Sequence, residues 1–152
     1  MSITTCLWFQ SDIEAALNRY VGLFPDSQIL SLTTTGTEPA VQLASWRMFG
    51  TTFRGICQPV DFHFSESISL SVSCADQNEV DRYWFGLLDG GGQESMCGWL
   101  KDPWGVSWQV VPVQLEALLG DPDPARAAAA TAHMLTQRRL VIADLQAAAD
   151  RA

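Results

Sequence analysis

Two stretches of the chain decide the fold: ITTCLWFQSDIEAALNRYVGL at residues 3–23 and ISLSVSCADQNEVDRYWFGL at residues 68–87. Each begins with alternating apolar and polar residues, which is typical of a strand, and continues with apolar residues at helical spacing. Their superposition aligns three identical pairs: Leu7 with Leu70, Arg19 with Arg82, and Tyr20 with Tyr83. The repeat predicts an internal duplication, because a small unit that cannot cover its own sheet is completed by a second copy.

Each copy is followed by three segments that are rich in β-branched and aromatic residues and are separated by turn residues, which predicts three further strands. The helix of the first copy is expected to begin at Ser11 with Glu14 in a capping box, and that of the second at Asp76 with Glu79. The predicted strands are 3–9, 28–34, 41–49 and 52–58, then 68–73, 93–97, 99–101 and 106–111. We therefore predict an α+β domain over residues 1–112, made of two βαβββ modules, about 1–60 and 61–112.

The remaining residues, 113–152, have a different composition. An Ala-rich stretch over 125–137 favours helix strongly, and shorter helical patterns cover 115–119 and 141–149. Short helices are marginal in isolation, so we expect this C-terminal extension to pack on the body or on a partner subunit.

Charge and cysteine usage exclude several classes of function. A net charge of −8 argues against a nucleic-acid partner, which requires a basic face. No apolar run is long enough to cross a membrane, and no signal peptide is visible at the N-terminus. We therefore expect a cytoplasmic protein with no membrane partner. Its four cysteines are widely spaced without a CxxC pair, which predicts free thiols and no structural zinc.

Several strings resemble one known family. The most specific is Cys97-Gly98-Trp99-Leu100-Lys101-Asp102, followed by Ser107-Trp108-Gln109-Val110. Earlier strings are Ile3–Phe9 and Phe62-His63-Phe64-Ser65-Glu66. With the tail motif DPDP at 121–124, these resemble the PhnB-like branch of the vicinal-oxygen-chelate (glyoxalase, bleomycin resistance, dioxygenase) superfamily, whose members are often labelled demethylubiquinone methyltransferase.

This resemblance implies a curved mixed sheet around a cavity between the modules, and a homodimer. In metal-dependent relatives, His, Glu or Gln at four inward strand positions bind the ion. The matching positions here are Thr4, Ser67, Gln109 and either Ile56 or Cys57. Hydroxyls and one amide are poor ligands for such metals, so the sequence predicts no metal site and no cofactor, with an atypical divalent-metal site as the alternative.

Candidate site residues follow from the predicted cavity. Aromatic walls with a few polar groups suit a flat or apolar ligand, which makes Trp8, Cys57, Trp99 and Gln109 candidate ligand-binding residues. The catalytic candidates are His63 and Glu66, as an acid/base pair, and Cys97, as a nucleophile. Each has a structural alternative: a surface hydrogen bond for the pair, and a buried structural thiol for Cys97.

Three functions remain open. The leading hypothesis is a metal-independent protein that binds a small apolar or aromatic molecule. The alternatives are a lyase or dioxygenase that uses His63, Glu66 and Gln109 with an atypical metal, and a structural homodimer whose cavity is filled by side chains. The chain has no nucleophile elbow, Walker loop or HExxH motif. The first predicted strand meets its helix through Gln10-Ser11-Asp12, so a Gly-rich Rossmann turn, which a methyltransferase of that fold would use, is missing.

Overall fold

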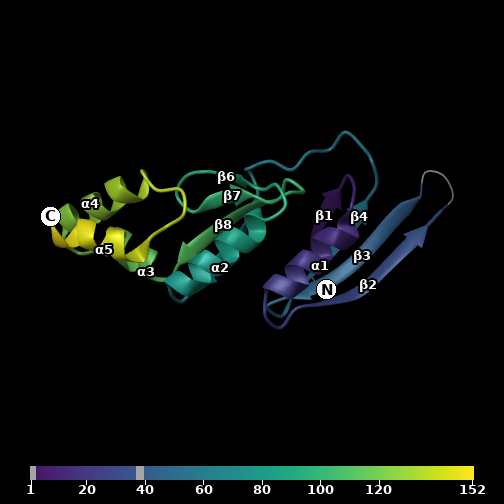
Figure 1. Cartoon of the computed structure of the whole chain (residues 1–152), viewed down its shortest axis with the longest axis horizontal. Helices are drawn as coiled ribbons and strands as arrows, with labels where there is room; N and C mark the ends of the chain where they lie inside the picture. The colour runs from purple at the N-terminus through teal and green to yellow at the C-terminus, as the bar shows by residue number, and fades with distance from the viewer. Residues whose placement is uncertain (1–2, 37–39) are drawn as a thin grey trace. The chain divides into compact units, whose positions relative to one another are not determined.

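The computed structural model describes residues 3–36 and 40–152, which form two compact units, Met1–His63 and Phe64–Ala152 (Figure 1). Residues 37–39, between the second and third predicted strands, lie outside the described residues. Each unit contains one four-stranded mixed sheet with its own helices. The predicted α+β class is confirmed. None of the described helices is long and apolar enough to span a bilayer.

The first unit runs through β1 (Thr5–Phe9), α1 (Ile13–Leu23), β2 (Gln28–Thr35), β3 (Val41–Met48) and β4 (Thr51–Cys57). The strand order is β1-β4-β3-β2. β1 is parallel to β4, and the other neighbours are antiparallel. The helix crossover from β1 to β2 and the two hairpins that follow give the predicted βαβββ order.

The apolar stripe of α1 covers one face of this sheet. Its buried residues are Ile13, Ala16, Leu17 and Tyr20. Trp46 of β3 is fully buried beneath this helix face and stacks on Phe53 of the neighbouring β4, with ring centroids 5.6 Å apart. Gly55 makes this packing possible, because a Cβ at that position would lie 2.7 Å from Cδ1 of Ile13 and 3.0 Å from the Trp46 ring.

The two helix starts differ. The capping box predicted at Ser11 and Glu14 is wrong: α1 begins at Ile13, and its N-cap Asp12 has φ 53° and makes no side-chain capping bond. Aspartate tolerates this left-handed conformation better than most residues. In the second module, Asp76 accepts a hydrogen bond from the Glu79 amide at 3.0 Å, and the Glu79 carboxylate accepts one from the Ala75 amide at 2.7 Å. The prediction at Asp76 is therefore confirmed.

The second unit repeats the topology of the first. It contains β5 (Leu70–Cys74), α2 (Gln77–Leu88), β6 (Gln93–Glu94), β7 (Trp99–Lys101) and β8 (Ser107–Pro112). The strand order is β5-β8-β7-β6, again with the first strand parallel to the last. The same order and the same pairing in both units confirm the predicted duplication.

β6 is much shorter than the predicted strand 93–97. Cys97 and Gly98 both have positive φ, at 60° and 82°. Their amides donate to the carbonyls of Gln137 and Arg138, each at 2.7 Å. The sheet edge therefore ends early because these amides bond to the C-terminal extension.

Asp102 organises the hairpin between β7 and β8. It is 3% exposed, and its carboxylate accepts hydrogen bonds from the amides of Trp104 and Val106, each at 3.0 Å, and from Nε1 of Trp108 at 2.9 Å. The neighbouring Lys101 does not pair with this buried carboxylate but with Glu66.

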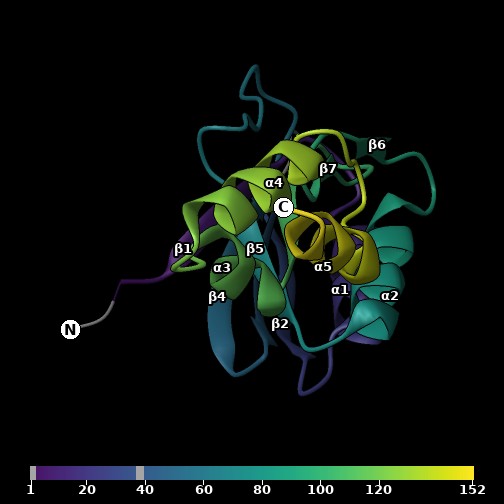
Figure 2. The ribbon, with the colours of Figure 1, turned by 90° about the vertical axis from the view of Figure 1, so that its left-hand side faces the viewer.

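The C-terminal extension forms α3 (Gln114–Leu119), α4 (Pro124–Met134) and α5 (Ile142–Asp150). Figure 2 shows α4 and α5 side by side, with α3 next to them. These helices share a small apolar core with the segment before α5: Leu115, Leu118, Ala130, Leu140, Leu145 and Ala149. α3 and α4 are each amphipathic toward this core, which makes the extension a packed layer of the second unit.

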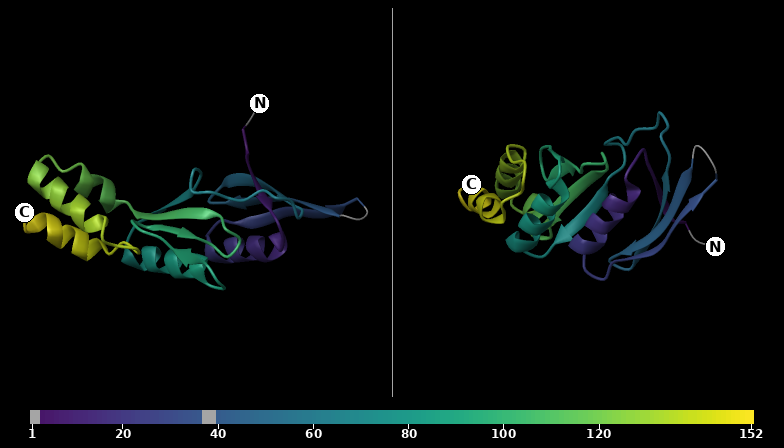
Figure 3. Two further views of the ribbon diagram at one scale, coloured as in Figure 1. Left: turned by 90° about the horizontal axis from the view of Figure 1, so that it is seen from above. Right: turned by 45° about the vertical axis from the view of Figure 1, so that its right-hand side comes forward.

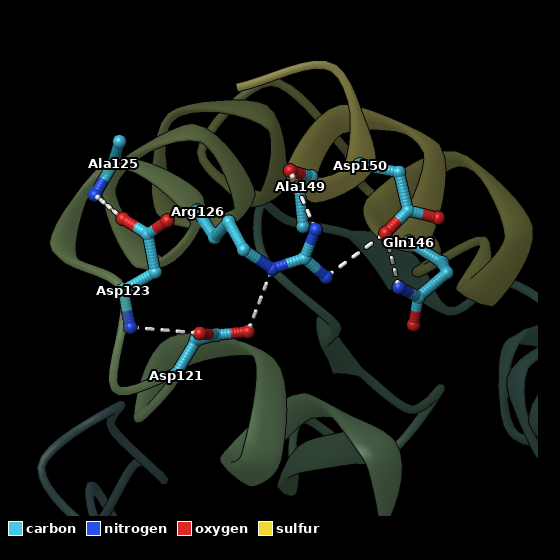
Figure 4. A network of polar contacts seen from close by, with 7 residues as sticks. All are labelled: Asp121, Asp123, Ala125, Arg126, Gln146, Ala149 and Asp150. Carbon is cyan, nitrogen blue, oxygen red and sulfur yellow. Dashed lines mark hydrogen bonds and ion pairs between the residues drawn. The ribbon is translucent and has the colours of Figure 1, made fainter.

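Two polar clusters hold the extension in place. In the first, Arg126 donates to Asp121, to the Ala149 carbonyl and to Asp150, joining the start of α4 to the end of α5 (Figure 4). The pKa of Asp150 is lowered, and the hydrogen bond from Arg126 is the largest cause. In the second, Gln77 on α2 donates to the Leu140 carbonyl and accepts from the amide of the first residue of α5.

Candidate functional site

One face of the first sheet is left uncovered by the helix of its unit. Figure 3 shows α1 against the other face, and α1 is the one helix among the described residues of this unit. Side chains alternate along the strands, so the residues that follow or precede the buried ones point to the uncovered face. Its exposed or half-buried members are Cys6, Trp8, Ser31, Thr33, Leu43, Ser45, Arg47, Arg54 and Ile56.

The strand register arranges most of these side chains in two adjacent rows across the sheet. One row is polar and runs Cys6, Arg54, Ser45, Ser31. The next row is mainly apolar and runs Trp8, Ile56, Leu43, Thr33. Directly opposed side chains have Cβ atoms about 4.5–5.5 Å apart, so each row forms one continuous strip of surface.

A hollow of about 510 Å³ lies on these rows. Side chains from all four strands line it, together with the backbone around Ala44 and Gly55. Leu43 is 45% exposed at its floor, which is unusual for a leucine in the middle of a central strand. The volume is in the range of small-ligand sites, about 300–1,000 Å³.

Trp8 lies at one end of the apolar row, as the alternation predicts. It is half-buried, donates through Nε1 to the Gln58 carbonyl at 3.2 Å, and meets Phe62 edge-on with centroids 5.2 Å apart. Cys57, by contrast, is buried in the core and shares with Phe53 and Gly55 the face that α1 covers. Its neighbour Ile56 lies on the uncovered face instead.

The corresponding face of the second sheet is polar. Gln109 lies directly opposite Trp99 and Ser71, and its Nε2 donates to Oγ of Ser69 at 2.7 Å. Two of the predicted ligand-binding residues, Trp99 and Gln109, are thus cross-strand neighbours on one face. A second hollow, of about 170 Å³, adjoins them and is lined by Trp99, Lys101, Ser107 and Glu66.

The expected acid/base pair of His63 and Glu66 finds other partners. His63 is 74% exposed, and its Nε2 lies 3.3 Å from Asp61 while its Nδ1 lies 2.9 Å from Nε2 of Gln10. Glu66 pairs with Nζ of Lys101 at 2.6 Å, and this hydrogen bond is the largest cause of the lowered pKa of Glu66. Each side chain therefore has the surface contact that was the alternative to a catalytic role.

Cys97 is half-buried in a turn rather than a strand, with φ 60° and its amide bound to the extension. These features give its backbone a structural role in the turn. The more deeply buried thiol is Cys74, whose pKa burial raises to about 12. All four thiols are free.

The four positions that the family resemblance matched to metal ligands carry side chains that do not fit a divalent ion. Thr4, Ser67 and Ile56 offer no strong ligand, and the Gln109 amide is hydrogen-bonded to Ser69. No cluster of three or more His, Cys, Asp or Glu side chains within residues 3–36 and 40–152 could hold a metal.

Trp8, Trp99 and Gln109 stay predicted site residues, and the sequence reasoning did not consider the residues that line the middle of the first sheet, namely Leu43, Ser45 and Arg54. The signal for them was present: β3 alternates between buried Ala44, Trp46 and Met48 and the residues between them. A strand of that kind has one buried face and one free face, and the residues on the free face are the candidates for ligand contacts.

The comparisons with known proteins agree with this architecture. A family described as 3-demethylubiquinone-9 3-methyltransferase matches residues 1–111. A PhnB protein from Bacillus cereus, described as a putative 3-demethylubiquinone-9 3-methyltransferase, is 31% identical with a TM-score of 0.67, covering 74% of this chain and 100% of its own. Protein PA1353 from Pseudomonas aeruginosa is 14% identical with a TM-score of 0.61, covering 73% of this chain and 98% of its own.

The fosfomycin resistance protein FosX from Listeria monocytogenes shares the fold, with 11% identity and a TM-score of 0.56 over 76% of this chain and 93% of its own. No curated protein matches the chain. With a family match over nearly three quarters of its length, this chain belongs to the 3-demethylubiquinone-9 3-methyltransferase-like family, in the PhnB-like branch of the vicinal-oxygen-chelate superfamily.

Proposed function

We propose that this protein binds a small molecule with an apolar or aromatic body on the uncovered face of its first sheet, without a metal centre. The observation that carries the proposal is the hollow of about 510 Å³, with Leu43 and Ile56 on its floor and hydroxyls of Ser31 and Ser45 beside them. Apolar surface with a few fixed polar groups is the usual composition of a small-ligand site.

The exposed apolar floor provides binding free energy. Covering about 100 Å² of apolar side-chain surface with a ligand contributes roughly 2.5 kcal/mol. Trp8 at the end of the same row adds an aromatic wall whose polar Nε1 already has a partner in Gln58, so its ring can contact an apolar group without leaving a donor unsatisfied.

The second unit, taken by itself, contains further proposed ligand contacts. Trp99 and Gln109 remain in this set, because they are cross-strand neighbours on one face of the second sheet and the Gln109 amide oxygen can accept from a donor on a ligand. Trp8 also stays in the proposed set, and Ile56 replaces Cys57.

We do not extend the methyltransferase description of the family to this chain. A Rossmann-type cofactor site places a Gly-rich turn between its first strand and helix. Here β1 leads into α1 through Gln10, Ser11 and Asp12, and β5 leads into α2 through Ala75 and Asp76. Neither connection offers the close backbone approach that such a cofactor needs.

The proposal includes a cytoplasmic location and a homodimer. Free thiols fit a reducing compartment. Exposed apolar side chains on the second unit, such as Ile68 at 74% and Phe85 at 57%, fit a protein contact. Sedimentation velocity tests the dimer, which would have twice the chain mass of 16.7 kDa.

The binding site is tested by NMR with a library of small aromatic and aliphatic molecules added to the full chain. Ligands are expected to shift the amides of the hollow, with Ser45 and Ile56 among the most affected. The variant Leu43→Ser should weaken binding by about tenfold or more through lost apolar contact.

Leu135→Ser is the matched control, since it removes an equally accessible leucine, 58% exposed, at the end of α4. It should leave binding unchanged. Ligand-induced shifts that avoid the first sheet altogether, or equal weakening by both variants, would contradict the proposed site.

A further inference from the structure

The four strands of the first sheet contain no acidic residue. Their sequences are TCLWF, QILSLTTT, VQLASWRM and TTFRGIC, in which the two charged residues are Arg47 and Arg54. The whole chain carries a net charge of −8. An acidic protein has thus kept one sheet free of carboxylates, and both of its charges are positive.

Both arginines point to the uncovered face. Along β4, Arg54 alternates with buried Phe53 and Gly55, and along β3, Arg47 alternates with buried Trp46 and Met48. Arg54 also lines the hollow, opposite Cys6 and Ser45 in the register. The positive charge therefore lies at the site.

These guanidinium groups differ from three others in the chain. Arg126, Arg138 and Arg139 each form an ion pair with an aspartate or glutamate. Within residues 3–36 and 40–152, no carboxylate forms an ion pair with Arg47 or Arg54. A guanidinium has five donors in a planar fork, so an unpaired one next to a hollow is ready to bind a planar anion.

The apolar row next to Arg54 limits what this anion can be. Ile56 is two residues from Arg54 on the same strand and face, and Leu43 lies opposite Ile56. A molecule that covers both rows must have an apolar body with an acidic group at one edge. A free inorganic ion would leave Leu43 uncovered.

Building on the proposed function, we propose that the ligand is an apolar or aromatic carboxylic acid, whose carboxylate binds the Arg54 guanidinium while its body covers Ile56 and Leu43. Bidentate pairing of arginine with carboxylate gives strength and orientation together. Ser45 and Ser31 continue the row of Arg54, and their hydroxyls can donate to the remaining lone pairs of the carboxylate oxygens. Arg47 strengthens the positive potential of the face.

The test compares 2-naphthoate with 2-naphthamide, which match in shape and differ in charge, by calorimetric titration of the full chain at low and moderate salt. The acid is expected to bind about tenfold tighter than the amide. Arg54→Gln should reduce this preference to less than about threefold, and Arg54→Lys should keep part of it, because it keeps the charge and loses the fork.

Arg151→Gln serves as the control: it makes the same change in net charge at an exposed residue of the other unit and should preserve the preference for the acid. Melting curves verify that each variant folds. Equal affinity for acid and amide in the unaltered chain, or an equal loss in the Arg54 and Arg151 variants, would overturn the carboxylate assignment and leave the proposed site intact. Failure to bind either compound, with no ligand in the NMR library shifting the first sheet, would overturn both proposals.

Discussion

The hairpin between β7 and β8 depends on one buried carboxylate, and its removal should be among the most damaging single changes in the second unit. Asp102 is 3% exposed, and its two oxygens accept from the Trp104 amide, the Val106 amide and Nε1 of Trp108. Asp102→Ala would leave these three donors without their acceptor, in a region where water has little access.

The magnitude follows from these three bonds. A hydrogen bond to a charged group contributes about 1.5–3 kcal/mol, and a buried donor without a partner costs about 1–3 kcal/mol. The sum is an upper bound, because the variant no longer desolvates a carboxylate and relaxation admits some water. We therefore expect the free energy of unfolding to fall by about 3–4 kcal/mol, which corresponds to a lower Tm by roughly 6–16 °C for a chain of this size.

Urea unfolding followed by far-UV circular dichroism measures this loss. Trp108→Phe keeps an aromatic side chain but removes one of the three donors and leaves a small cavity, so it should cost about 1–3 kcal/mol. Asp144→Ala, at an exposed residue in the first turn of α5, should cost less than about 1 kcal/mol. If Asp102→Ala lowers stability by no more than the Asp144 variant, the carboxylate does not hold the hairpin and the reasoning fails.

Four further outcomes are expected. The Oγ of Ser107 is buried without a hydrogen-bond partner in the described chain, so Ser107→Ala should change the urea midpoint little or raise it, and a marked loss would reveal a hidden partner. Lys101→Gln should raise the pKa of Glu66 toward its ordinary range in a carbon-13 NMR titration, and an unchanged pKa would refute the pairing. In the unaltered chain the ion pair should be fully present above the ordinary pKa of Glu66 and be lost as the pH falls through the lowered pKa. At pH 8, exposed Cys6 should react quickly with a disulfide reagent, whereas Cys74, whose pKa is about 12, should react only after unfolding; fast modification of Cys74 in the native protein would show that its burial is wrong. Micromolar zinc or manganese should leave the Tm unchanged, because the inward donors do not fit a metal, and a clear rise would restore the enzymatic alternative.

The duplicated topology could be predicted because it depends on local patterns. The alternation in each first strand and the stripe on each helix are set by which residues avoid water. Strand ends were less accurate where tertiary contacts decide them. β6 stops at Glu94 because the amides of Cys97 and Gly98 bond to residues 137 and 138, which no local pattern reveals.

The sheet faces on which the candidate site residues lie could be predicted in part, because they too depend on local alternation. Alternation places Trp8 and Gln109 correctly on uncovered faces. It assigned Cys57 to the ligand because the strand could be read in either of two phases, and a shift of one residue exchanges the faces. Gly55 resolves the phase, since only a glycine fits between Ile13 and Trp46. The partners of His63 and Glu66 come from loops and hairpins, whose geometry the sequence does not specify.

The two copies also show which half of the scaffold is free to carry function. The two copies can be aligned by placing Leu7 on Leu70, and the strand pairings extend this alignment to β4 and β8. The helix-facing residues that it matches are apolar in both copies, such as Phe9 with Val72 and Cys57 with Val110.

On the uncovered face the same superposition equates Trp8 with Ser71 and Ile56 with Gln109. Packing against a helix requires an apolar side chain in both copies, whereas nothing in the fold requires a particular side chain on the uncovered face. The side chains of the two faces differ in chemistry, with Arg54, Ile56 and Leu43 on the first sheet and Ser71, Gln109 and Trp99 on the second. Under the proposed function, each face would therefore prefer a different chemical group.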